Sequence, residues 1–326
     1  IISTEEPQQE VLNTENITIT FSTRLSLIPM SYKNKTPTLQ QKSYLESIDT
    51  KSPFNANERQ ASIFVFPDGS YGSDGFKKYV KRQGDKYVFK EKFMDKKGIE
   101  QKGVLQYIEK DVYSIFNFSS KFWFYISNEM KLKGNSFCYI ESVTGSGLIV
   151  LELLLEYYGF QKYNATTSLN LAPKKRFAVI TGDTKNINSI LKVFNSPENK
   201  NGDYIQMIVA SEVARDGINL SNVVRGYLMT PTWHESGSHQ ALSRFIRATS
   251  HQELLKNQEN VEIKIYKLCS CTDVEYIKTT EFNPTTLENL TRYSVDVKNY
   301  IKSGIKDISN KQMMQKFKNI AFEKDV

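Results

Sequence analysis

Between residues 119 and 270, short apolar runs alternate with longer segments that have helical periodicity. Strands that alternate with helices of about ten to fifteen residues form βαβ units, because each helix carries the chain back so that the next strand runs parallel to the last. The sequence therefore predicts an α/β fold built on a parallel sheet. The expected strands are 136–141, 177–181, 204–210, 226–229 and 261–268, and the expected helices are 120–134, 148–158, 185–194 and 239–248.

The segments that flank this region differ from it in composition. Residues 1–57 are rich in Ser, Thr, Asn, Gln and Glu, with strand-like runs at 17–21 and 25–29, so we expect an extended, irregular connector. Residues 58–118 contain a Pro-Asp-Gly turn and then alternating charged and aromatic positions, and we expect an insertion that leads into the sheet domain. Residues 271–326 are expected to form a helical extension with a basic face.

The charge of the chain is compatible with a polyanionic partner but does not require one. Lysines and arginines outnumber aspartates and glutamates by 43 to 36, a net charge of +7. Three cysteines are too few for a disulfide framework and favour a reducing compartment. No apolar run approaches the roughly 20 residues of a membrane span, so no membrane partner is expected. His234, Glu235 and His239 lack a usual ligand spacing, so no metal site is expected.

Three loops at the expected carboxyl ends of the strands have compositions that suit a polar ligand, and open parallel sheets bind their ligands at this edge. The first loop, Val-Thr-Gly-Ser-Gly at 143–147, places small hydroxyl and glycine residues before a helix, where backbone N–H groups can meet an anion. Thr144 and Ser146 are therefore candidate phosphate contacts. A tight turn with Ser146 as the helix cap explains the same residues equally well.

The second loop follows the strand at 204–210. Ser211 at the strand end can donate a hydrogen bond to a phosphate, and Gly217 allows a backbone to approach closely. A hydroxyl, an acidic residue, a glycine and then Asn-Leu form a specific order, which makes 211–220 a candidate binding segment.

The third loop leads into a helix that carries Gln240, Arg244 and Arg247. Spacings of four and three residues place these side chains on one helix face. Planar, cationic arginine tips suit a triphosphate, whose transfer chemistry needs positive charge at the γ-phosphate. Most arginine pairs on helices are only solvated faces, so the spacing alone favours that simpler interpretation.

The order of the three loops resembles the C-terminal RecA-like domain of superfamily 2 helicases. Residues 144–147 stand where the fourth motif of that family begins, and 211–220 resemble its fifth. Residues 240–247 resemble its sixth, Gln-x-x-Gly-Arg-x-x-Arg, with Ser243 in place of the glycine. Similarity to the Swi/Snf-like branch rests on 217–220, Trp233, Gln240-Ala241 and 120–123.

A closer resemblance is to helicases of large DNA viruses related to the poxvirus early transcription factor small subunit and to nucleoside triphosphate phosphohydrolase I. It is carried by 66–72, 194–199, Arg247 and Ser250-His251, and by the tail from 287 to 321. In that family, 58–118 would be a family-specific insertion. The first RecA-like domain of such enzymes, with its phosphate loop and Asp-Glu motif, does not occur in this sequence. We therefore expect the C-terminal half of a larger protein, inactive alone.

The resemblance also implies roles for single residues. ATP and Mg²⁺ would be held mainly by an N-terminal RecA-like domain of the same protein. Arg247 would be the arginine finger on the γ-phosphate, with Arg244 beside it, and Gln240 would sense the nucleotide. Asp216, Gly217 and Asn219 would bind the nucleotide, and Thr144, Ser146 and Ser211 would contact nucleic acid.

Taken as a whole, the resemblance predicts a nucleic-acid-dependent ATPase of viral transcription, a helicase or translocase. Its expected partners are DNA and viral transcription subunits, and its expected location is the virion and the host-cell cytoplasm. The alternative is a non-catalytic, helicase-like scaffold that binds DNA within a transcription complex.

Overall fold

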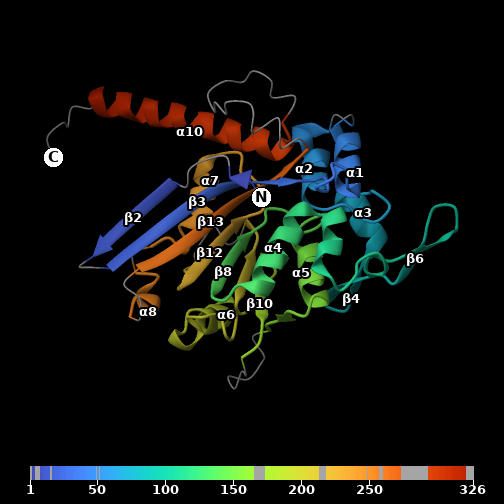
Figure 1. The fold of residues 1–326 in the computed structure, drawn as a ribbon, viewed down its shortest axis with the longest axis horizontal. Helices are drawn as coiled ribbons and strands as arrows, with labels where there is room; N and C mark the ends of the chain where they lie inside the picture. Colours follow the sequence, from blue (N-terminus) through green and yellow to red (C-terminus); the bar gives the residue numbers. More distant parts are fainter. Residues whose placement is uncertain are drawn as a thin grey trace.

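One large sheet runs through the chain, of which the computed structural model describes residues 2–3, 8–14, 17–48, 50, 52–164, 173–212, 218–247, 249–256, 260–272 and 293–320. The sheet has the order β1-β3-β13-β12-β8-β11-β10-β9, with β2 also paired to β3 (Figure 1). Among these strands the seven from β9 to β3 are parallel, and β1 and β2 are antiparallel to β3. Their bounds are β1 Ile2–Ser3, β2 Gln8–Thr14, β3 Ile17–Pro29, β8 Asn135–Tyr139, β9 Gln161–Lys162, β10 Arg176–Ile180, β11 Met207–Ala210, β12 Val223–Leu228 and β13 Asn260–Cys271.

The α/β fold with a parallel sheet, as predicted for 119–270, is confirmed. Each of the five expected strands has a counterpart, in β8, β10, β11, β12 and β13. Every residue of β8, β10 and β11 is buried, because helices cover both faces of a parallel sheet, and the strands are mainly apolar, with Asn135, Ser136 and Arg176 as buried polar residues at the amino ends of β8 and β10. The architecture fits the RecA-like domain that the resemblance implies.

Helices pack on both faces of the sheet, and alternate residues of β8 belong to different cores. Cys138 packs with the helices α4 (Ser120–Lys131) and α5 (Leu148–Tyr157). Phe137 and Tyr139 pack in a second core with residues from the other face. That face is covered by α6 (Ile187–Phe194), α7 (Glu235–Leu242) and α8 (Gln252–Leu255) (Figure 1).

Strand β3 corrects the expectation of an irregular connector at 1–57. The two runs expected at 17–21 and 25–29 are parts of one 13-residue strand, whose residues 18–29 pair in parallel with 260–271 of β13. Ser22, Thr23 and Arg24 separate the two apolar runs, so the sequence alone suggests two short strands. The proposed domain boundaries at residues 57 and 270 remain predictions.

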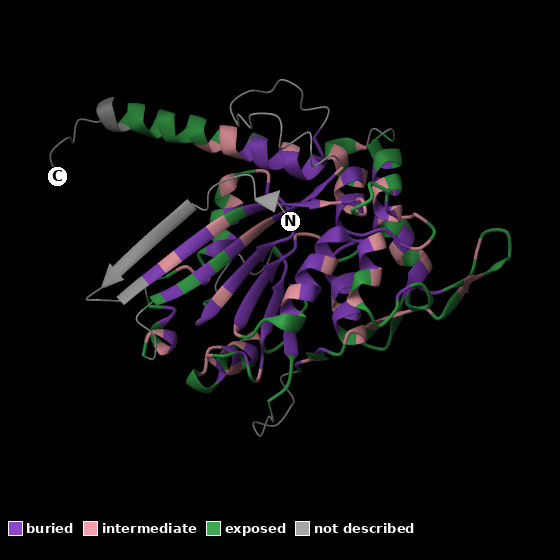
Figure 2. Ribbon diagram, viewed as in Figure 1, coloured by how far each residue is buried: buried purple, intermediate pink, exposed green. Residues whose placement is uncertain are grey.

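Residues between β3 and α4 form small helices and two hairpins, and the second hairpin projects from the body of the molecule (Figure 1). Figure 2 shows that this projection is largely exposed. The elements are α1 (Leu39–Ile48), η1 (Pro53–Asn55), α2 (Ala56–Ile63), α3 (Gly72–Tyr79), β4 (Val80–Gln83), β5 (Lys86–Phe89), β6 (Lys92–Met94), β7 (Glu100–Lys102), η2 (Val104–Gln106) and η3 (Val112–Asn117).

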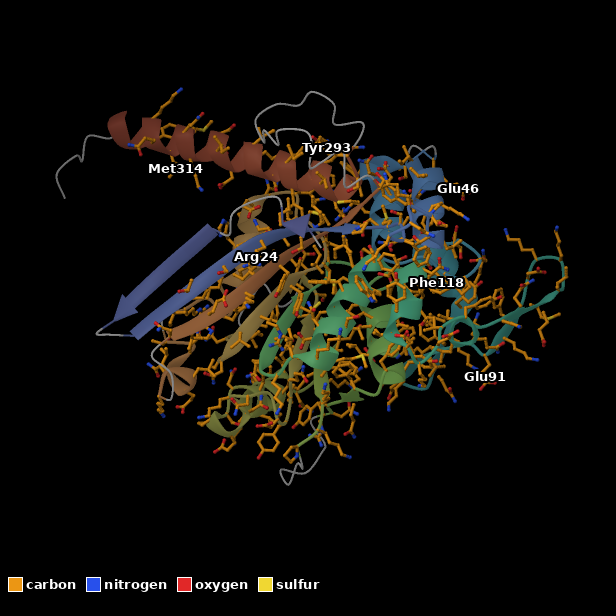
Figure 3. The ribbon with its side chains drawn as sticks, viewed as in Figure 1. Arg24, Glu46, Glu91, Phe118, Tyr293 and Met314 are labelled. Atoms are coloured by element: carbon orange, nitrogen blue, oxygen red, sulfur yellow. The ribbon has the colours of Figure 1, made fainter. Side chains whose placement is uncertain are left out.

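The C-terminal helix α10 (Val295–Ile320) begins buried and ends exposed. Asp296 in its first turn forms a buried ion pair with Lys121 of α4 (2.5 Å) and accepts a hydrogen bond from the Ser270 N–H (2.9 Å). A carboxylate is favourable there because it faces the positive end of the helix dipole. The distal turns, where Met314 lies (Figure 3), are exposed. No helix in the described residues is long and apolar enough to cross a membrane.

Candidate functional site

The helix expected at 239–248 ends earlier than predicted. Helix α7 stops at Leu242, so Gln240 lies in the helix while Arg244 and Arg247 follow it, and the three side chains do not share one helix face. The Ser243 hydroxyl donates to the Gln240 carbonyl (2.9 Å), a side-chain bond that competes with helix continuation. We call residues 243–251 the arginine loop; Ala248 within it lies outside the described residues.

The arginine loop is tied to the segment that precedes and begins β12. The Leu220 N–H donates to the Arg244 carbonyl (2.9 Å), and the Asn222 N–H donates to the Ser250 carbonyl (2.7 Å). His251 adds a third bond, in which Nε2 donates to the Val223 carbonyl (3.0 Å). A carbonyl can only accept, so this bond places the proton of the neutral ring on Nε2. Burial lowers the pKa of His251, and the neutral ring keeps the bond.

Phe245 anchors the arginine loop in the core beneath it. Its ring is fully buried and packs on Phe137 of β8, with ring centroids 5.8 Å apart. Gly226 of β12 provides the space, because a Cβ atom there would lie 2.6 Å from the Phe245 Cζ. Since Phe245 lies between Arg244 and Arg247 in sequence, its pocket determines where both arginines leave the core.

The two arginines differ in their surroundings. Arg247 is exposed, and its Nε–H donates to the Ser243 carbonyl (2.9 Å). Arg244 is half-buried, and within the described part of the chain its Nε–H is enclosed without an acceptor. An enclosed donor left unpaired costs about 1–3 kcal/mol, a cost that an anionic ligand would remove. Gln240 is exposed on α7. This set of donors suits a phosphate.

The segment expected to bind nucleotide is described only in part. Asp216 and Gly217 lie outside the described residues. Ser211 is buried at the end of β11, and its N–H donates to the Ile180 carbonyl (3.1 Å). The Asn219 side chain is exposed.

Asn195 holds this segment from the end of α6, a contact that sequence reasoning missed. Its Nδ2 donates to the Asn219 carbonyl (2.8 Å), and its Oδ1 accepts from the Ser221 N–H (2.8 Å). Two signals in the sequence pointed to Asn195. It directly follows a helix, a position that more often serves a local turn, and it lies in 194–199, one of the segments that carry the resemblance.

Thr144 and Ser146, the two candidate phosphate contacts in the loop at 143–147, differ in their exposure. Ser146 is fully buried: its hydroxyl donates to the Phe64 carbonyl (2.7 Å) and accepts from the Gly72 N–H (2.9 Å). Its own N–H donates to Gln60 Oε1 (2.9 Å), so in the described structure Ser146 is occupied in joining the loop to α2 and α3. Segments far away in the chain bury Ser146, so the structure does not support the direct contact with nucleic acid that the composition of the loop suggested. That contact remains a prediction. Thr144 is exposed.

An aromatic and cationic cluster covers the ends of β8 and β12. The Arg59 guanidinium lies 5.3 Å from the centre of the Trp233 ring and pairs with Glu141 (2.5 Å). The Phe54 ring also packs edge to face against the Trp233 ring, with ring centroids 6.1 Å apart. Trp233 is therefore held beside the loops of the candidate site by residues of η1 and α2.

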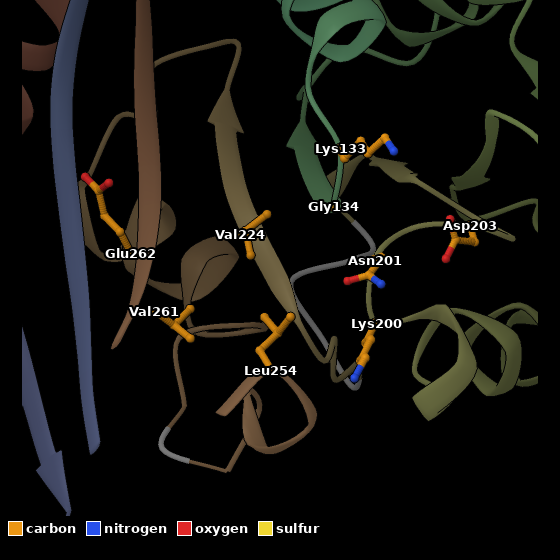
Figure 4. Close-up of a pocket in the computed structure, with 9 residues that line it drawn as sticks. All are labelled: Lys133, Gly134, Lys200, Asn201, Asp203, Val224, Leu254, Val261 and Glu262. Carbon is orange, nitrogen blue, oxygen red and sulfur yellow. The ribbon is translucent and has the colours of Figure 1, made fainter. Parts of the chain in front are cut away.

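The sheet also has a cavity of about 310 Å³ at the opposite edge, near the amino ends of β8, β12 and β13 (Figure 4). None of the predicted site residues lines it. Its lining is Lys133, Gly134, Lys200, Asn201, Asp203, Val224, Leu254, Val261 and Glu262. A larger hollow of about 570 Å³ is lined in part by Leu242 of α7 and by Ser243 and Ile246 of the arginine loop.

Comparison with known proteins agrees with the resemblance seen in the sequence. "Putative helicase 087L" of Invertebrate iridescent virus 3 is 31% identical over 279 residues, which is 84% of this chain and 26% of that protein. "Putative helicase 009L" of Frog virus 3 is 28% identical over 65% of this chain and 20% of that protein. The early transcription factor 70 kDa subunit of Fowlpox virus is 29% identical over 59% of this chain and 29% of that protein.

Comparisons with family models and with solved structures add less. No model of a protein family matches the chain. A solved structure, the C-terminal part of the Fun30 ATPase domain, aligns over 54% of this chain and 48% of that chain at 14% identity. The TM-score of 0.30 is too low to establish a shared fold. The chain spans about a quarter of the length of the curated relatives it matches. Over that span, the chain is a homologue of helicase-like proteins of DNA viruses, the 70 kDa subunit of poxvirus early transcription factor among them.

Proposed function

We propose that this chain is the C-terminal half of a nucleic-acid-dependent ATPase, a helicase or translocase of viral transcription. The observation that carries the proposal is the arginine loop, which Leu220, Asn222 and Val223 hold where β12 begins. Arg247 is exposed there, and Arg244 has a donor enclosed without an acceptor among the described residues. Two positioned guanidinium groups can neutralise charge that develops on a transferred phosphoryl group.

In this proposal the nucleotide lies between the arginine loop and an N-terminal RecA-like domain of the same protein. Arg247 is the finger, Arg244 supports it, and Gln240 senses the nucleotide. Asp216, Gly217 and Asn219 belong to the same surface. Viral transcription subunits are the expected partners, in the virion and the host-cell cytoplasm.

Nucleic acid, DNA in our proposal, lies along the exposed loops of the carboxyl edge. Thr144 is exposed and available to it. Ser211 and Ser146 are buried, so they support that track by positioning its backbone. Trp233 adds an aromatic face beside the same loops.

The described residues fit the phosphates of ATP better than they fit Mg²⁺. Arginines and backbone N–H groups are phosphate ligands, whereas Mg²⁺ needs carboxylate oxygens. In the part of the chain that the structure describes, no group of three or more His, Cys, Asp or Glu residues is arranged to hold a metal. We assign Mg²⁺ to the N-terminal domain, as the resemblance implies.

Substitution of the finger in the full-length protein tests the proposal. Arg247→Ala should lower the DNA-stimulated ATPase rate by about 10³–10⁵-fold, because the charge opposite the γ-phosphate is lost. DNA affinity should remain largely intact. The matched control is Arg24→Ala, which removes an exposed arginine of β3 (Figure 3). Undiminished ATPase in the Arg247 variant would refute the finger assignment, whereas no ATPase in the unsubstituted full-length protein would favour the non-catalytic scaffold.

A further inference from the structure

Residues 72–102, which we call the basic arm, concentrate the positive charge of the chain. The arm comprises α3 and the hairpins β4–β5 and β6–β7. It has ten lysines and arginines against five aspartates and glutamates, a net charge of +5, whereas the whole chain has +7. It contains about a tenth of the residues but most of the excess positive charge.

Much of this charge is free to meet a partner. Among the described residues, the ammonium groups of Lys77, Lys81, Lys96, Lys97 and Lys102 are exposed and form no hydrogen bond or ion pair. Lys78 and Lys92, in contrast, pair with Asp68 (2.9 Å) and Glu100 (2.8 Å). The arm is thus not a face on which alternating charges neutralise each other, which is the usual condition of a solvated surface.

The outer turn of the arm is preorganised. Asp95 Oδ1 accepts from the N–H groups of Lys97 and Ile99 (both 2.9 Å), and Gly98 adopts a φ of +76°. A carboxylate that caps its own turn in this way holds the tip in one conformation. Lys96 and Lys97 are therefore displayed on an ordered turn, which lowers the entropy lost when they bind.

The base of the arm is attached to the core. Tyr79 stacks on Phe66 (centroids 5.2 Å apart) and meets Phe93 of β6 edge to face (4.7 Å). The Gly103 N–H donates to the Glu91 carbonyl (2.7 Å), and a Cβ at Gly103 would lie 1.8 Å from the Lys90 carbonyl oxygen. This crossing therefore requires glycine and fixes where the hairpin leaves the body.

The arm begins at the candidate site. The Gly72 N–H, at the start of α3, donates to the buried hydroxyl of Ser146, and an added Cβ at Gly145 would lie 3.3 Å from Gly72. Thr144 is exposed in that same loop. The base of the arm therefore lies beside the loop that carries Thr144.

The tip also exposes apolar groups. Met94 and Ile99 are 63% and 56% exposed on the β6–β7 hairpin, next to the tip lysines. Lysines that surround exposed methionine and isoleucine suit nucleic acid, since phosphates take the charges while apolar side chains lie against sugars and bases.

From these observations we propose that the basic arm is a nucleic-acid-binding element that extends the track of the candidate site, with Lys81, Lys96 and Lys97 on the phosphate backbone. The inference rests on the proposed function, because one nucleic acid is to lie along both the basic arm and the loops of the candidate site. It adds a contact outside the helicase motifs, at a hairpin that no motif includes.

The test compares two triple substitutions in the 326-residue chain. The first is Lys81→Glu, Lys96→Glu and Lys97→Glu. The control is Lys131→Glu, Lys133→Glu and Lys174→Glu, three exposed lysines near the amino ends of β8 and β10. Both variants change the net charge by the same amount, so only the place of the charges differs. Fluorescence anisotropy with a labelled mixed-sequence DNA duplex is measured over a range of salt concentrations, and circular dichroism verifies folding.

The arm variant should bind about tenfold or more weakly at low salt, with a slope of log K against log salt lower by about 2–3, because three phosphate contacts are lost. The control should stay near the unsubstituted chain. Equal losses in both variants, or none in the arm variant, would overturn the arm while leaving the proposed function standing. No DNA binding by the unsubstituted chain would overturn both. Binding of the chain to vesicles of anionic lipid, but not to DNA, would reassign the arm to a membrane surface.

Discussion

The contact between Gly226 and Phe245 gives the sharpest test of how the arginine loop is positioned. Gly226→Ala would place a methyl group 2.6 Å from the Phe245 Cζ and 3.3 Å from its Cε1. The ring is fully buried against Phe137, so it cannot yield without leaving its pocket. Overpacking of this kind costs about 1–3 kcal/mol. Phe245→Leu removes the Cζ atom at a separate cost of about 1–3 kcal/mol.

The two substitutions should not be additive. In the Phe245→Leu background the added methyl group no longer meets Cζ, so the double variant should lose less stability than the sum, by about 0.5–3 kcal/mol. Urea unfolding followed by circular dichroism measures each free energy. Gly304→Ala is the matched control, because a Cβ there meets nothing within 4 Å and alanine favours the helix. Additive costs, or a Gly226→Ala variant as stable as the unsubstituted chain, would refute the packing argument.

Two further predictions concern buried polar groups. Arg225→Met should lower the free energy of unfolding by about 3–5 kcal/mol, because Glu129, which accepts from Arg225 Nε (2.9 Å) and Nη2 (3.1 Å), keeps a buried charge without its cation; adding Glu129→Leu should recover part of the loss, and a single variant without a large loss would contradict this. Because burial lowers the pKa of His251, its neutral ring contributes stability that is complete above pH 6.5 and is lost as the pH falls below that value, by at most about 1.4 kcal/mol per pH unit. His251→Gln should flatten that part of the pH profile in urea unfolding, and an unchanged profile would show that His251 does not titrate there.

Much of the fold was predictable because burial imposes a local pattern. Strands β8, β10 and β11 are buried on both faces, and their mainly apolar composition is visible in the sequence. Strand β3 is harder to recognise as one strand, because Ser22, Thr23 and Arg24 separate its two apolar runs. Its place depends on pairing with β13, about 240 residues away, which no local pattern encodes.

The candidate site divides in the same way. The order of Ser211, Asn219, Gln240, Arg244 and Arg247 along the chain carries the resemblance to the helicase motifs, and that resemblance implies phosphate chemistry. The end of α7 at Leu242 was not predicted, because a buried phenylalanine and a serine hydroxyl compete there with local helix propensity.

The sequence by itself determined the alternation of strands and helices and the kinds of side chain that reach the carboxyl edge. Only the tertiary structure decided which of them remain available. Ser146 and Thr144 are two residues apart in one loop, yet Phe64, Gly72 and Gln60 occupy the first and leave the second exposed. Availability depends on segments far away in the chain that fold over a residue, because burial and hydrogen-bond partners are properties of packing.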